Sequence, residues 1–204
     1  MKKSLLIASM SVLAGNAFAL TAFDDASNYG GGWADGSSLG SGFGTWSLTS
    51  DGSTGGFAGY FIGDSTAGAG DINTGSSQSF AMYANGAADS SVAATRSFST
   101  ALTTDDQFSF DFAVNFADGN RGFNLRTSGT NVIGLNIGST TNINTGFTDN
   151  STNAQTYDYG GGDAMLQAVI QVIGLDRVDY QISRISSQGV QGVLFAGSIT
   201  DIVG

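Results

Sequence analysis

The 204-residue sequence contains no cysteine, histidine, proline or glutamate, and its only lysines are Lys2 and Lys3. Without cysteine no disulfide can form, so packing and backbone hydrogen bonds alone must hold the fold. The missing histidine and cysteine exclude a Ser-His-Asp triad, a Cys-His pair and the usual zinc sites. Most common catalytic designs are therefore excluded.

Residues 1–19 have the pattern of a signal peptide. Lys2 and Lys3 give a positive start, residues 5–15 form an apolar stretch too short to span a bilayer, and Ala17-Phe18-Ala19 is a small-x-small cleavage site. We therefore expect a secreted or cell-surface protein of residues 20–204, with no membrane span in the mature chain. That length suits a single domain.

Cleavage would remove both lysines and leave five arginines against seventeen aspartates, a net charge of −12. Nucleic-acid binding needs Lys and Arg to displace the counterions of the phosphate backbone. Nucleic acid and anionic membranes are therefore excluded as partners. Such acidity is typical of proteins that stay soluble in the open or that collect divalent cations.

Alternating apolar and polar residues predict an all-β protein. The clearest strand is Gln107–Ala117, where phenylalanines at every second position share one face. Weaker alternation predicts strands near residues 43–49, 57–62, 80–83, 121–127, 132–137, 177–185 and 190–200. The Ser128-Gly129 link between residues 121–127 and 132–137 predicts a hairpin. Residues 166–173 could also form a helix, but their β-branched content and Gly174 favour a strand. Many short strands with no fixed repeat indicate an antiparallel sandwich or barrel.

Aspartate is the only acidic residue on which catalysis could rest. Two carboxyl groups could cleave a glycosidic bond, or could share a proton as in aspartic proteases. The nearest protease-like triplet, Asp64-Ser65-Thr66, lacks the following glycine. Because most aspartates stand beside Gly, Ser or Asn, turn formation is the simpler interpretation, and we expect no catalytic residue.

Calcium binding is another use for these carboxylates. Asp158 and Asp163 flank a glycine-rich loop, and Asp24, Asp25 and Asp71 offer further oxygen ligands. Calcium needs six to eight oxygens gathered from several loops, and solvated loop aspartates would give the same pattern. A structural calcium ion is therefore a hypothesis.

Carbohydrate binding is suggested by aromatic residues, because aromatic rings pack on the apolar faces of sugars. Four aromatic residues lie in glycine-rich loop sequence: Tyr29, Trp33, Tyr157 and Tyr159. Packing of these rings onto the end of a sheet would explain the sequence equally well. Trp46 and Tyr180 lie inside predicted strands, and we expect them in the core.

Several segments resemble a group of exported, glycine-rich bacterial proteins. The segments are Phe23-Asp24-Asp25-Ala26, residues 42–48, residues 59–65, residues 79–85 and Arg96-Ser97-Phe98. Proteins of this group look like concanavalin A-like jelly-roll sandwiches, and many carry a C-terminal PEP-CTERM-type sorting segment. The resemblance covers about residues 23–147 and implies a fold and a surface-related setting, but no activity and no site residues.

A sorting segment of that type contains Pro-Glu-Pro, a hydrophobic span and basic residues. The present sequence stops instead at Asp201-Ile202-Val203-Gly204. Two interpretations follow from this difference, namely a chain truncated at its C-terminus or a complete and freely secreted protein.

The fold expected from these observations is an antiparallel two-sheet β-sandwich of the concanavalin A-like jelly-roll type. The expected function is a non-catalytic module that binds extracellular polysaccharide. The alternative is a structural component of the bacterial surface or biofilm matrix. A third and less favoured hypothesis is an Asp-dependent glycoside hydrolase, which would need two carboxyl groups about 5 Å or about 6.5–9.5 Å apart.

Overall fold

The computed structural model describes residues 22–30, 32–64, 76–86, 89–114, 119–137, 141–149, 165–186 and 189–203. These ranges contain one short 3-10 helix and twelve strands. The elements are η1 (Ala26–Tyr29), β1 (Ser47–Asp51), β2 (Phe57–Asp64), β3 (Gln78–Asn85), β4 (Ser91–Thr95), β5 (Gln107–Ala113), β6 (Arg121–Thr127), β7 (Thr130–Ile137), β8 (Thr141–Asn144), β9 (Thr148–Asp149), β10 (Met165–Gly174), β11 (Arg177–Ser186) and β12 (Gly189–Thr200). No helix in this part of the chain is long and apolar enough to cross a membrane.

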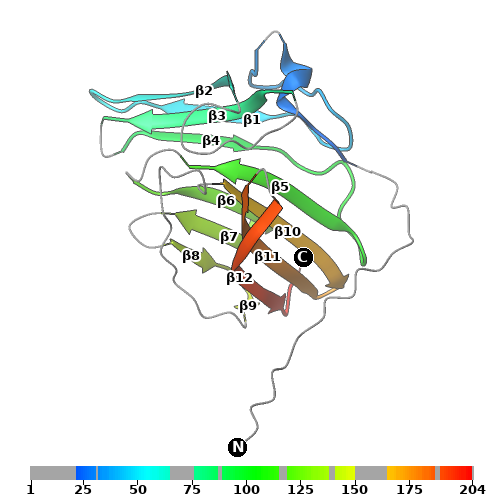
Figure 1. Ribbon diagram of the computed structural model, residues 1–204. Coiled ribbons are helices and arrows are strands. Elements are labelled where there is room, and N and C mark those ends of the chain that lie inside the picture. The colour runs from blue at the N-terminus through cyan, green and yellow to red at the C-terminus, as the bar shows by residue number, and fades with distance from the viewer. Residues whose placement is uncertain are drawn as a thin grey trace, which may run out of the picture.

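All strand pairs are antiparallel and fall into four sheets. β1 pairs with β4, and β2 pairs with β3. β6, β7 and β8 form a three-stranded sheet. The remaining strands form a five-stranded sheet in the order β5-β10-β11-β12-β9. In Figure 1 the strands β1 to β4 lie above the strands β5 to β12. The predicted all-β, antiparallel architecture is confirmed, and it is consistent with a β-sandwich.

The larger hydrophobic core contains residues of the three-stranded and the five-stranded sheets. Ile133 and Ile137 of β7 have no exposed surface, and they belong to the same buried cluster as Leu166 of β10, Ile182 of β11 and Ile199 of β12. The segment with the ambiguous pattern, residues 166–173, lies within β10 and is a strand as predicted. Tyr180 is buried in this core, also as predicted.

The hairpin of β6 and β7 shows how local sequence sets the register. Ser128 and Gly129 both have positive φ, 47° and 84°, which is the backbone that a type I′ turn requires. This turn places Thr127 opposite Thr130, and a one-residue register shift between Leu125 and Arg126 then brings Phe123 opposite Leu135. The predicted Ser-Gly hairpin is therefore confirmed.

A second, smaller core is formed by the strand pairs β1–β4 and β2–β3 together with η1 and the loop that follows it. Its buried members are Tyr29, Trp33 and Leu48, and partly buried hydrophobic residues pack against them: Trp46, Tyr60, Ile62, Phe80 and Ala94. β1 contacts β2, and β3 contacts both β4 and η1. Trp46 therefore belongs to a core, as its position in the sequence predicts.

A row of phenylalanine rings extends from the larger core to Phe43, just before β1. The ring of Phe43 lies 5.1 Å from that of Phe98, and Phe98 meets Phe108 of β5 edge to face at 5.1 Å. Phe110, two residues further along β5, meets Phe123 of β6 edge to face at 4.6 Å. The predicted one-sided strand is thus confirmed over residues 107–113, with its phenylalanines half-buried on one face. Residues 115–117 of that prediction lie outside the described residues.

Candidate functional site

A buried ion pair joins the N-terminal segment to the end of β4. Nη1 of Arg96 contacts Oδ2 of Asp24, and both side chains are only 7% exposed. The guanidinium carbon of Arg96 lies 4.5 Å from the centre of the Phe43 ring and 4.7 Å from that of Trp46. Nε and Nη2 of Arg96 also donate to the carbonyl oxygen of Gly44, at 3.2 and 2.8 Å. The cation is therefore compensated by a charge, a carbonyl and two aromatic faces.

Tyr29 extends this network from η1. Its hydroxyl accepts a hydrogen bond from Nε1 of Trp46 at 3.0 Å. The same hydroxyl lies 2.8 Å from Oδ2 of Asp24 and 2.9 Å from the carbonyl oxygen of Leu39, and its single proton can be donated to one of them at a time. Burial, together with the hydrogen bond to Asp24, raises the pKa of Tyr29.

Tyr29 and Trp33 pack in the interior and do not face solvent. Tyr29 is 1% exposed and Trp33 is 5% exposed. Trp33 meets Trp46 and Tyr60 edge to face, with ring centres 5.2 and 5.7 Å away. The prediction that these two rings are displayed to a ligand is wrong, because η1 and the loop after it fold over the sheet and bury large aromatic surfaces there. Tyr157 and Tyr159 lie outside the described residues.

Asp24 is also wrong as a calcium ligand. Its Oδ1 accepts from the backbone N–H of Asp25 at 3.0 Å and from Nδ2 of Asn28 at 3.3 Å. Its Oδ2 faces Arg96 and Tyr29. With hydrogen-bond donors on both oxygens and an arginine already neutralising the charge, this carboxylate has no free face for a divalent cation.

Asp25 has a local structural role. Its Oδ1 accepts from the backbone N–H of Ser27 at 2.8 Å and from the hydroxyl of Ser76 at 3.2 Å, and it caps η1. Burial alone would raise the pKa of Asp25, but the hydrogen bonds from Ser27 and Ser76 together lower it. Asp71, Asp158 and Asp163 lie outside the described residues. Within the part that is described, no three acidic side chains form a group that could hold a metal ion.

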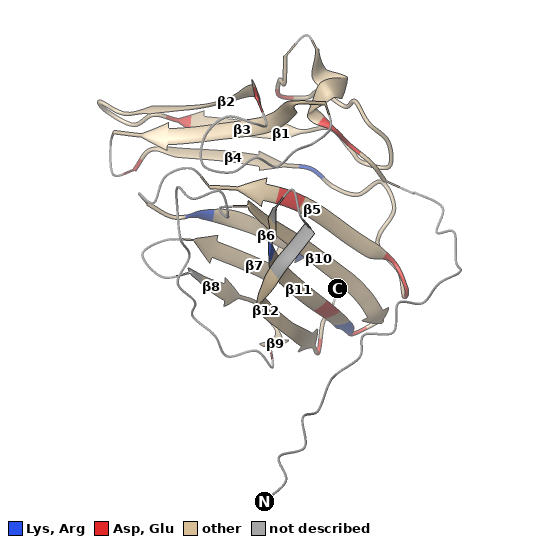
Figure 2. Cartoon of the chain, viewed as in Figure 1, with Lys and Arg blue, Asp and Glu red and all other residues tan. Residues whose placement is uncertain are grey.

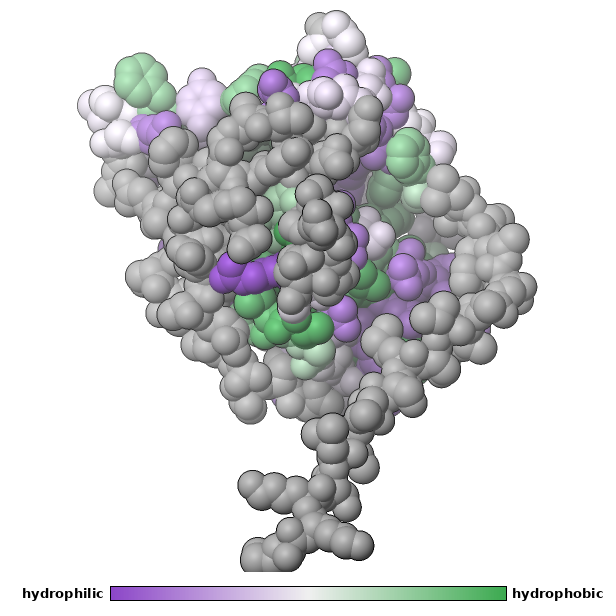
Figure 3. Space-filling model, in the orientation of Figure 1, coloured by the Kyte–Doolittle hydropathy of each residue, from purple (hydrophilic) through white to green (hydrophobic). Residues whose placement is uncertain are grey.

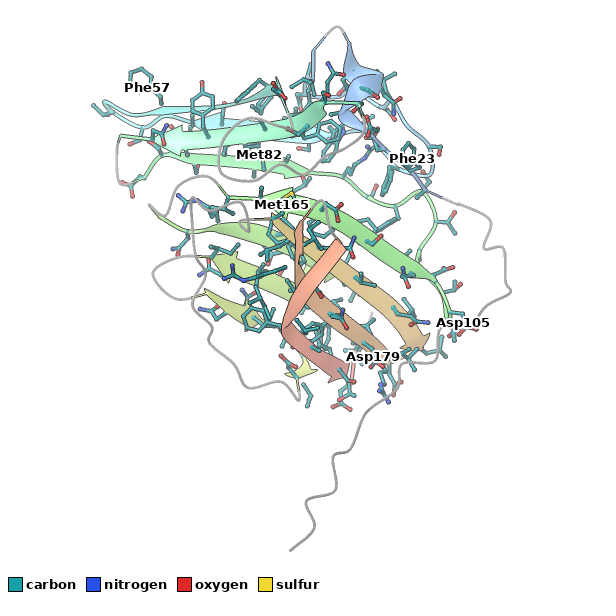
Figure 4. All side chains as sticks on the ribbon, in the orientation of Figure 1. Phe23, Phe57, Met82, Asp105, Met165 and Asp179 are labelled. Carbon is teal, nitrogen blue, oxygen red and sulfur yellow. The ribbon has the colours of Figure 1, made fainter. Side chains whose placement is uncertain are left out.

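Three of the four exposed aromatic side chains among the described residues lie on the hairpin of β2 and β3, and the fourth, Phe23, lies in the N-terminal segment. We define the hairpin face as the side of this hairpin that carries Phe57, Phe61 and Tyr83, which are 71%, 47% and 42% exposed. Neighbouring residues in each strand point to opposite sides, so Tyr60 and Phe80 pack into the small core while the hairpin face points away from it. Figure 4 shows Phe57 projecting outward from the start of β2, and Figure 3 shows hydrophobic surface beside that strand.

The two inner rings of the hairpin face lie over glycines. Tyr83 stands directly opposite Gly59, and a Cβ added to Gly59 would lie 2.8–3.0 Å from the hydroxyl and ring atoms of Tyr83. A Cβ added to Gly63 would lie 3.2 Å from the ring of Phe61. The rings of Phe61 and Tyr83 have centres 6.2 Å apart. They fold down along the sheet because glycine leaves room for them, and this makes a broad apolar surface.

The hairpin face carries no charge. Its remaining positions include Ser79, Ala81 and Asn85, which stand opposite Gly63, Phe61 and Phe57. Figure 2 shows how widely spaced the charged residues are over the described strands. Phe57, Phe61 and Tyr83 lie in predicted strands, whereas the predicted ligand contacts are all in loops.

A signal for these residues was present in the sequence. β2 has large apolar side chains at successive positions, Tyr60, Phe61 and Ile62, and so offers them on both faces. A two-stranded hairpin covered on one side must leave the other set exposed.

No protein-family model matches this chain, and no curated protein and no solved structure is significantly similar to it. The resemblance to exported jelly-roll proteins therefore stays a prediction.

Proposed function

We propose that this protein is an exported, non-catalytic module of the jelly-roll type that binds neutral extracellular polysaccharide through the hairpin face. The observation that carries the proposal is the pair of rings, Phe61 and Tyr83, lying over glycines on an exposed and uncharged strand surface. Sugar rings have apolar C–H faces that stack on aromatic rings of this kind.

The surroundings of the rings suit a hydroxyl-rich ligand. The hydroxyl of Tyr83 and the side chains of Ser79 and Asn85 supply polar groups on the same strands. Exposed apolar patches on soluble proteins commonly mark interaction sites. Because the mature chain carries five arginines against seventeen aspartates, an acidic polysaccharide would be repelled by the protein as a whole. This charge favours a neutral polymer.

Affinity electrophoresis in gels containing neutral polysaccharides, together with sedimentation with insoluble ones, tests the proposal. We expect the chain to be retarded or pulled down by at least one polymer. The double variant F61A/Y83A should weaken that binding at least tenfold because it removes both rings. Trp33 and Trp46 lie beneath the hairpin, so unchanged tryptophan emission would show that the variant is folded.

Two exposed hydrophobic residues provide matched controls. Met82 is 50% exposed and lies on the opposite side of the same hairpin, opposite Tyr60, and Leu175 is 97% exposed in the turn between β10 and β11. M82A and L175A should bind like the wild type. Failure of every polymer to bind, or equal binding by F61A/Y83A and the wild type, would refute the proposal.

A structural role in a surface matrix is the second candidate, and the 71% exposure of Phe57 favours it. An apolar strand surface of this kind can also associate with a second copy. Sedimentation velocity over a range of concentrations distinguishes the two functions. Concentration-dependent assembly that F57A/F61A abolishes would favour the structural role, whereas a monomer throughout would exclude assembly through this face.

A further inference from the structure

Asparagines surround a glycine on the outer face of the three-stranded sheet. Asn124 of β6 and Asn144 of β8 both stand directly opposite Gly134 of β7. Residues directly opposite each other project to the same side of a sheet. The neighbouring Ile133 and Leu135 point into the larger core, so this row of asparagines faces away from the core.

A β-bulge adds one more asparagine to this face. Leu125 stands opposite Ile133, but Arg126 stands opposite Asn131, so Val132 is the extra residue in β7. Val132 is 5% exposed and belongs to the same core as Ile133. The bulge therefore lets two successive residues point inward and turns Asn131 outward, in line with the ability of bulges to redirect side chains.

These side chains line an open hollow of about 370 Å³. We call it the asparagine hollow and name it for Asn120, Asn124, Asn131, Asn136 and Asn144. Arg121 also lines it, but Arg121 stands opposite the buried Ile137, which places its side chain on the core side of the sheet. No carboxylate lines it, although aspartate is common in the chain. Its volume lies near the lower end of the range of roughly 300–1,000 Å³ for small-molecule sites.

Gly134 lies between two of these asparagines. A Cβ at Gly134 would lie 2.4 Å from the side-chain oxygens of both Asn124 and Asn144. The two amides therefore converge on one point above the backbone of β7, which any larger residue would fill. A solvated polar strand surface does not by itself require a glycine at its centre.

The amides keep hydrogen-bonding capacity for a ligand. Asn131 donates to Asn144 at 3.3 Å, and Asn136 donates to Asn120 at 3.4 Å. Among the described residues, none donates to or accepts from the amide of Asn124. Each amide has two N–H donors and an oxygen acceptor, so most of the capacity of these five side chains is still open.

The chemistry of the lining selects a neutral ligand with many hydroxyl groups. A hydroxyl both donates and accepts, as an amide does, whereas a metal cation needs carboxylates that are missing here. The nearby guanidinium of Arg126 donates to Asn131 at 2.9 Å. We propose that the asparagine hollow is a binding site for a short neutral saccharide, recognised by hydrogen bonds. This site is separate from the hairpin face and does not rest on the function proposed there.

Titration of the isotope-labelled protein with neutral disaccharides, namely cellobiose, maltose, lactose and chitobiose, tests this site. The side-chain amide signals of asparagine in ¹H–¹⁵N spectra report contact directly. We expect at least one disaccharide to shift the signals of Asn124 and Asn144. The double variant N124A/N144A should weaken its binding at least tenfold.

Two controls separate this site from others. Gln171 is exposed in β10, which belongs to another sheet, so Q171A should bind like the wild type. L175A should also leave the shifts of the Asn124 and Asn144 signals unchanged, because Leu175 lies in the turn between β10 and β11, which belong to another sheet. Absence of any shift, or equal affinity of N124A/N144A and the wild type, would overturn the proposal without affecting the hairpin face.

Discussion

Replacing Arg96 by methionine should unfold or loosen the small core. Methionine keeps most of the length of the side chain and can still pack between Phe43 and Trp46, but it carries no charge and donates no hydrogen bond. Asp24 would then keep a buried carboxylate without its cation, and the carbonyl of Gly44 would lose two donors. The main penalty is therefore an uncompensated buried charge.

The magnitude follows from the burial of the pair. With both side chains only 7% exposed, removing one partner of such a pair costs about 3–5 kcal/mol. The same range includes the energy of the lost cation–π contacts. Each contact is worth about 0.5–2 kcal/mol, and the methionine side chain partly replaces the packing of the guanidinium on the two rings. For a chain of this length, each kcal/mol lowers the melting temperature by about 2–4 °C. We therefore expect a decrease of roughly 6–20 °C in R96M.

Tryptophan fluorescence during urea and thermal denaturation measures this effect, because both tryptophans, Trp33 and Trp46, lie in the small core. The exposed pair of Arg177 and Asp179 gives a matched control, with side chains 46% and 39% exposed and an N–O distance of 2.9 Å. R177M should cost about 0–1 kcal/mol. If R96M is no more destabilising than R177M, the ion pair does not hold the small core.

A second variant tests the stated cause. In D24N/R96M no charge remains buried, and the asparagine oxygen can still accept from the hydroxyl of Tyr29. The double variant should therefore be more stable than R96M alone, because neutral replacements for a buried pair often cost little. A double variant as unstable as the two single changes added together would show that lost packing, and not an unpaired charge, causes the destabilisation.

Two further predictions concern single positions. Because the pKa of Tyr29 is raised, the protonated hydroxyl of Tyr29 stabilises the fold fully below pH about 10, and this stabilisation is lost as the pH rises through the raised pKa. The loss of stability at alkaline pH should therefore be less steep in Y29F than in the wild type. Titration of tyrosinate absorbance should show one late-titrating tyrosine fewer in Y29F. Gly122 has φ of 155° and a Cβ there would lie 1.7 Å from the carbonyl oxygen of Leu135, so G122A should cost more than about 1 kcal/mol in chemical denaturation. A Cβ added to Gly192 would have no atom within 4 Å, and its φ is not positive, so G192A should be close to neutral; equal costs for both alanines would contradict the steric argument.

The strands were predictable because their side chains alternate over several residues. Phenylalanines at every second position of β5 and the Ser128-Gly129 turn between β6 and β7 each depend on local geometry that the sequence states directly. The existence of two separate cores was not predictable. The division into two cores depends on which strand pairs pack against each other. Contacts between residues far apart in the chain, such as Trp33 and Phe80, determine this packing.

The candidate site was predicted less well for the same reason. A loop aromatic such as Trp33 and a strand aromatic such as Phe61 are both large and hydrophobic, and only the packing of η1 against β3 shows which of them is covered. Asp24 likewise resembles a free loop carboxylate until Arg96, 72 residues later, is placed beside it. The asparagine hollow also depends on a bulge at Val132, and no repeated pattern in the sequence marks that bulge.

The segments that resemble exported jelly-roll proteins contain packing residues and outward-facing residues in alternation. In β2, Tyr60 packs into the small core while Phe61 faces outward, and in β3 Phe80 packs inward while Tyr83 faces outward. A sequence resemblance along such a segment therefore does not distinguish a shared fold from a shared ligand, because each strand contains residues for both. The two sets are constrained differently: inward positions must fill a fixed volume next to the pair formed by Arg96, whereas outward positions need only suit the ligand. Substitutions such as Phe61→Leu should therefore change binding while leaving tryptophan emission unchanged, and Phe80→Leu should do the reverse.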